Sequence, residues 1–105
     1  MSSDDLREHQ QFAMNIEQAI RTTNREVLHP IVDPLTEDKV LSVAVEVAKR
    51  RAAYIGAALK AGAADQPSPS GDELRVLRLE YEECRDAFAE LMTAIERGYV
   101  DLPVT

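Results

Sequence analysis

The stretch LRVLRLEYEECRDAFAELMTAI, residues 74–95, decides the fold of this chain. One line of side chains recurs in it at alternating steps of three and four residues: Leu74, Leu77, Tyr81, Cys84, Phe88, Leu91 and Ile95. The first third of the chain repeats the spacing at Leu6, His9, Ala13, Ile16, Ile20, Thr23 and Val27. Such a line lies along one side of a helix that packs lengthwise on other helices. With a third helical segment between them, the two lines predict an all-α, three-helix antiparallel up-down-up bundle with coiled-coil-like packing.

Capping residues place the ends of the expected helices. We expect helices over about residues 3–28, 37–62 and 71–97, followed by a tail over 99–105, all in one domain spanning 1–105. The residues that mark these ends are Ser2 or Ser3, Thr36, the pair Ser70 and Glu73, and Gly98. Ser and Thr side chains accept hydrogen bonds from the first turn of a helix, and glycine adopts the left-handed conformation that ends one. Phe88 and Ile16 are expected in the core.

Composition excludes several classes of function. The chain has 105 residues, a net charge of −7 and one cysteine. Its acidity disfavours nucleic acid and anionic membranes as partners. A single cysteine forms no internal disulfide, and the N-terminus lacks the basic and apolar regions of a signal peptide, so a cytoplasmic location is expected. The most apolar stretch, residues 52–64, is too short to span a bilayer.

No catalytic, metal or cofactor motif is found in the sequence. Glu26 and His29 give a single Glu-x-x-His, whereas a di-iron bundle requires that motif on two helices and further inward glutamates. His9 lacks the neighbouring Lys and Gly of a phosphotransfer bundle. Four unclustered glycines exclude a dinucleotide fingerprint and a P-loop. We therefore expect no metal and no cofactor.

Arg51 is the anomaly of the expected core. On a helical wheel it falls near the centre of the inward face of the second helix, where an unpaired charge is costly. An ion pair with Glu80, or failing that with Glu17, is the structural interpretation. The alternative is a ligand site in a polar pocket around Arg51, where the aligned helices place Tyr54 and Tyr81 at nearly the height of His9. These four residues are the candidate ligand-binding residues.

The leading functional interpretation is a non-enzymatic interaction or assembly module, self-associating as a homodimer and open to a protein partner. Apolar residues that one three-helix core cannot easily cover favour it. They are Val40, Leu41, Val43, Ala44, Val45, Val47 and Ala48 on the second helix, with Val76 and Leu79 on the third. The alternative is a small-ligand-binding or catalytic bundle around Arg51. A weaker alternative is an acidic inhibitor that mimics nucleic acid through Glu80, Glu82, Glu83, Asp86 and Glu90.

Overall fold

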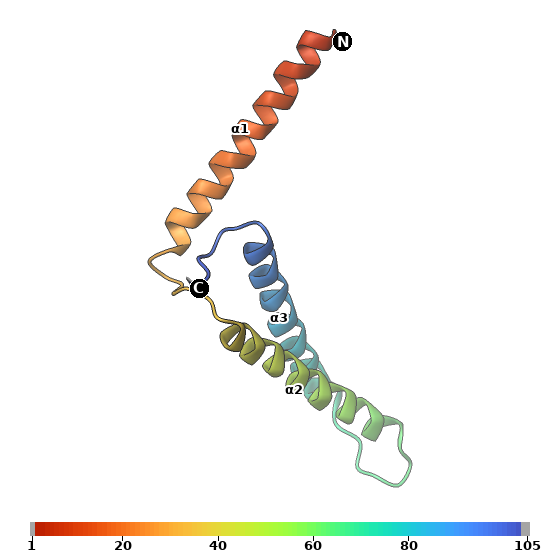
Figure 1. The fold of residues 1–105 in the computed structure, drawn as a ribbon. Helices are drawn as coiled ribbons and strands as arrows, with labels where there is room; N and C mark the ends of the chain where they lie inside the picture. Colours follow the sequence, from red (N-terminus) through yellow and green to blue (C-terminus); the bar gives the residue numbers. More distant parts are fainter. Residues whose placement is uncertain (1, 104–105) are drawn as a thin grey trace. The chain divides into compact units, whose positions relative to one another are not determined.

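Three α-helices account for most of the chain. The computed structural model describes residues 2–103, which contain α1 (Ser3–Leu28), α2 (Glu37–Gly62) and α3 (Gly71–Glu96) and no strand (Figure 1). Each helix has 26 residues, which corresponds to a length of about 39 Å. The all-α fold is as predicted, and the helix ends agree with the expected ones to within a residue. Positions 104 and 105 of the expected tail lie outside the described residues.

The predicted caps form. The side chain of Ser2 accepts a hydrogen bond from the backbone N–H of Asp5, and the Asp5 carboxylate accepts one from the Ser2 N–H. Ser70 and Glu73 make the same reciprocal pair at the start of α3. Thr36 caps α2 by accepting from the Lys39 N–H. These bonds satisfy donors that a helix leaves unpaired in its first turn, which is why each helix begins where it does.

Gly98 ends the third helix, as predicted. Its φ of +72° lies in the left-handed region, which costs other residues energy. The Tyr99 N–H then donates to the carbonyl oxygen of Ala94 at 2.8 Å, which folds the chain back on the last turn. This arrangement is the C-terminal capping motif that the glycine indicates.

The chain divides into two compact units. Unit 1 comprises the residues up to Leu35 together with those from Thr93 onwards, and unit 2 is Thr36–Met92. In unit 2, α2 and α3 run side by side in opposite directions and are joined by residues 63–70 (Figure 1). Val47 of α2 is 6% exposed, and the half-buried residues of α3 include Leu77, Tyr81, Cys84 and Phe88. The antiparallel packing of α2 with α3 is therefore as predicted.

Unit 1 holds its C-terminal segment through the last turns of α1. The Arg21 Nε donates to the Arg97 carbonyl oxygen at 3.2 Å. The backbone N–H of Leu35 donates to the Asp101 carbonyl oxygen at 2.9 Å. Val100 is buried. Along the rest of α1 the predicted line of apolar residues is not buried: Ile16, expected in the core, is 45% exposed. Within unit 1, the C-terminal segment reaches only the end of that helix.

Candidate functional site

Three of the four predicted ligand-binding residues meet between α2 and α3. The Arg51 Nε donates to the Tyr81 hydroxyl at 3.3 Å, and the Arg51 guanidinium lies 5.4 Å from the centre of the Tyr81 ring. The Tyr54 and Tyr81 rings stack with their centres 6.3 Å apart. A guanidinium over a phenol ring is a favourable cation–π arrangement. Arg51, Tyr54 and Tyr81 therefore form one cluster that joins the two helices.

The expected ion pair between Arg51 and Glu80 does not form. Arg51 is exposed, and within unit 2 no carboxylate lies within ion-pair distance of it. It is Arg50 that reaches Glu80, and it does so through the backbone carbonyl oxygen at 3.5 Å. The helical wheel placed Arg51 too close to the centre of the packed face, which Val47 occupies. A long side chain beside that centre reaches the edge and retains contact with water.

Arg85 was missed by the sequence analysis. Its guanidinium lies 5.4 Å from the centre of the Tyr81 ring, and its Nε lies 3.1 Å from Asp86 Oδ1. The hydrogen bond from Arg51 lowers the pKa of the Tyr81 phenol, and Arg85 lowers it further. A signal was available, because residues four apart on a helix are neighbours and Arg85 follows Tyr81 by four.

His9 belongs to unit 1. Its ring Nδ1 lies 2.6 Å from the carbonyl oxygen of Asp5, in its own helix. The local bond satisfies one ring nitrogen without any residue of the Arg51 cluster.

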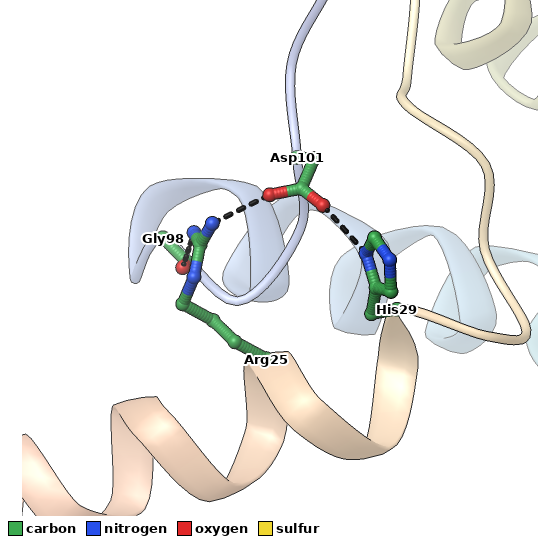
Figure 2. A network of polar contacts seen from close by, with 4 residues as sticks. All are labelled: Arg25, His29, Gly98 and Asp101. Carbon is green, nitrogen blue, oxygen red and sulfur yellow. Dashed lines mark hydrogen bonds and ion pairs between the residues drawn. The ribbon is translucent and has the colours of Figure 1, made fainter.

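A second polar cluster lies in unit 1, at the end of α1. Figure 2 shows Arg25 of α1 and His29, which follows the end of that helix, on either side of Asp101, with Arg25 also reaching Gly98. The Arg25 Nη2 lies 2.5 Å from Asp101 Oδ1, and the His29 Nδ1 lies 2.9 Å from Asp101 Oδ2. The hydrogen bond from His29 and the charge of Arg25 lower the pKa of the Asp101 carboxyl. The cluster fastens the C-terminal segment to α1.

Metal ligation is not indicated in the described part of the chain. No group of three or more His, Cys, Asp or Glu side chains there is placed to hold a metal ion. In the Glu-x-x-His motif of Glu26 and His29, the His29 ring contacts the Asp101 carboxylate. Nor does any helix within residues 2–103 have the length and apolar character needed to cross a bilayer.

The acidic strip of α3 is interrupted by arginines. Arg78 lies 3.9 Å from Glu82, and Arg85 lies 3.1 Å from Asp86. Both pairs are exposed and follow the helix surface. Such pairs are typical of a solvated helix face, and exposed ion pairs of this kind contribute little to stability.

In unit 2, a stripe of exposed apolar residues runs along α2. Its members are Leu41, Val45, Ala48, Ala52, Ile55 and Leu59, again at alternating steps of four and three. The four large side chains of the stripe are between 42% and 70% exposed. The side of α2 that faces α3 carries Val40, Val47 and Tyr54. The next residue after each of these belongs to the stripe, namely Leu41, Ala48 and Ile55. One residue is about 100° around a helix, so the four large side chains of the stripe lie beside the line that packs on α3 and not on it. Ala52 of the stripe also borders a hollow lined by Pro67, Pro69 and Leu77.

Comparison with known proteins adds no functional assignment. The chain matched no protein-family model, no curated protein and no solved structure.

Proposed function

We propose that this chain is a non-enzymatic interaction module that self-associates through an exposed apolar helix face, in the reducing environment of the cytoplasm. The observation that carries the proposal is the α2 stripe, defined above as Leu41, Val45, Ala48, Ala52, Ile55 and Leu59. Four large apolar side chains on one continuous line, outside the contact with α3, are a feature of association surfaces. A pair of helices alone has one line of contact and a small core, so a further helix on the stripe adds apolar burial that the pair lacks.

Sedimentation velocity tests the proposal. Across about 1 to 100 μM, a range in which weak dimers dissociate, the average mass should rise from the 11.7 kDa of one chain towards twice that value. The variant Leu59→Glu places a charge on the stripe and should remain closer to the monomer mass. Thr22→Glu, at an exposed position of α1, is the control. A wild-type chain that stays monomeric over the whole range contradicts the proposal.

The Arg51 cluster supports a second candidate function, the binding of a small anion. Two guanidinium groups flank Tyr81, and Arg51 has no carboxylate partner within unit 2. A carboxylate or phosphate matches the planar fork of an arginine. In an NMR titration with inorganic phosphate, the Tyr81 ring signals should shift. Arg51→Met should abolish the shift and leave the folded chain intact. The absence of a saturable shift in the wild type contradicts this candidate.

A further inference from the structure

The apolar stripe on α2 is symmetric about its own midpoint. Leu41 and Leu59 each lie nine residues from position 50, Val45 and Ile55 each lie five, and Ala48 and Ala52 each lie two. Two copies of the stripe laid antiparallel thus match layer by layer, large against large at the ends and small against small in the middle. A two-fold interface requires this kind of self-complementarity, because the same patch must serve on both subunits.

We infer that the partner on the α2 stripe is a second copy of this chain, with the two α2 helices antiparallel about a two-fold axis near position 50. The inference rests on the proposed function, in which the partner is a second copy, and adds the register and direction of the pairing. Leu41 then faces Leu59 of the second copy, Val45 faces Ile55, and Ala48 faces Ala52.

Charge favours the antiparallel direction over the parallel one. The first turn of α2 carries Glu37 and Asp38, and its last turn carries Lys60. Antiparallel pairing places the acidic turn of one copy beside the basic turn of the other, and it opposes the two helix dipoles. Parallel pairing would place both acidic turns together, where like charges repel.

Small residues border the stripe and allow the two backbones to approach closely. They are Ser42, Ala44, Gly56 and Ala58. Gly56 lies in the interior of α2, where glycine destabilises a helix by about 1 kcal/mol relative to alanine. A methyl group added at Gly56 would meet nothing within 4 Å in the chain itself, so packing inside the chain does not require the glycine. Close approach of a second helix accounts for it.

Two cations near the axis are already engaged. Lys49 lies 3.5 Å from Glu46 on the same helix, and Arg51 lies over the Tyr81 ring on the α3 side of the stripe. The Lys49 charge is therefore balanced by a carboxylate, and the Arg51 guanidinium is held on the α3 side of the stripe and away from the axis. From Leu41 to Leu59 the stripe covers 19 residues, which is about 27 Å along a single helix. One helix face of that length offers less area than the roughly 800 Å² that a standard stable interface buries on each partner. We accordingly expect a dimer with a Kd in the micromolar range.

Two matched substitutions test the surface. Ala52→Glu puts a carboxylate in the centre of the stripe, and Ala53→Glu makes the same change on the neighbouring position outside it. Both positions are exposed, so both variants should fold, as circular dichroism will confirm. We expect Ala52→Glu to raise the Kd at least about tenfold and Ala53→Glu to change it less than about twofold. Equal effects of the two substitutions overturn the inference.

Disulfide trapping tests the direction of pairing. Leu41→Cys and Leu59→Cys are made separately in a Cys84→Ser background, because Cys84 is the only native thiol. Antiparallel copies bring positions 41 and 59 within disulfide reach, so mild oxidation of the mixture should yield mainly the mixed 41–59 dimer. Glu46→Cys mixed with Ala53→Cys, off the stripe, is the control and should not trap. Mainly 41–41 and 59–59 dimers, or equal trapping by the control, overturn the inference.

The two experiments separate the inference from the proposed function. If sedimentation finds a dimer that Leu59→Glu weakens, but position 41 does not trap with position 59, the stripes pair in another geometry, and only the inference fails. If sedimentation finds a monomer throughout, the proposed function fails, and the inference fails with it.

Discussion

Different forces stabilise the inside of each of the two compact units of this protein. Unit 2 depends on side chains packed between two helices, with Val47 buried and Tyr54 stacked on Tyr81. Unit 1 depends on polar groups at the end of one helix, where Arg25 and His29 fasten Asp101. Apolar packing is insensitive to pH and strongly sensitive to side-chain shape. Exposed charged contacts are sensitive to pH and depend little on side-chain shape. The comparison therefore predicts that the two units respond to different perturbations.

The largest effect is expected from a charge in the packed line of unit 2. Val47→Asp buries an unpaired carboxylate and should lower the free energy of unfolding by about 3–5 kcal/mol, measured by urea denaturation. Val76→Asp, at a position of α3 that is more than half exposed, is the matched control and should cost less than about 1 kcal/mol. Similar losses from both variants would mean that Val47 is not the centre of the packing.

A smaller effect is expected at the turn that begins the C-terminal segment of unit 1. Gly98→Ala forces a side chain into the left-handed region and should cost about 1–2 kcal/mol. The added methyl group would meet only Arg21 Cδ at an ordinary 4.0 Å, so the cost comes from the backbone and not from a clash. Gly71→Ala, where φ is ordinary and space is open, should leave stability unchanged or raise it. Urea denaturation compares the two variants.

The polar cluster of unit 1, in which Arg25 and His29 hold Asp101, should open in acid and is called the clamp below. Because His29 and Arg25 lower the pKa of Asp101 in the folded chain, the stabilising carboxylate contribution is present above the ordinary pKa of an aspartate, about 4. The contribution is lost as the pH falls through the lower folded value. Amide exchange of Leu35, whose N–H donates to the Asp101 carbonyl oxygen, reports the clamp.

Asp101→Asn should produce the same opening at neutral pH, with exchange of the Leu35 amide faster by about tenfold. Asp65→Asn, in the connector of unit 2, is the control and should leave that amide protected. Unchanged exchange in Asp101→Asn would show that the backbone alone holds the segment.

The smallest effect is expected at the Arg51 cluster, and it is spectroscopic. Because Arg51 and Arg85 lower the pKa of Tyr81, an alkaline absorbance titration should contain a step below the ordinary tyrosine pKa. Ionised Tyr81 stabilises the folded chain above the ordinary tyrosine pKa of about 10, and this contribution is lost as the pH falls through the lower folded value. Tyr81→Phe should remove that step of the titration, and Arg51→Met should move it to higher pH. A step below the ordinary pKa that survives Tyr81→Phe belongs to another tyrosine.

Local chemistry made the helices predictable. Ser2, Thr36, Ser70 and Gly98 act through hydrogen bonds and backbone angles within a few residues, so the sequence alone fixes where each helix begins or ends. The antiparallel order of α2 and α3 follows from the short connection of residues 63–70. The same short connection sets which residues of α2 and α3 lie side by side, so the sequence could predict that Tyr81 lies near Arg51 and Tyr54.

Contacts between distant residues were decided only by the tertiary structure. Periodicity gives the side of a helix on which Arg51 lies, but it does not choose between the Glu80 carboxylate and the Tyr81 ring, because a long side chain reaches both. Likewise, Asp101 lies more than 70 positions from Arg25 and His29, and no local pattern joins them. Sequence determined the helices and their apolar lines, because these depend on near neighbours. Which line α3 covers, and which stripe of α2 it leaves free, depends on the angle at which the two helices pack.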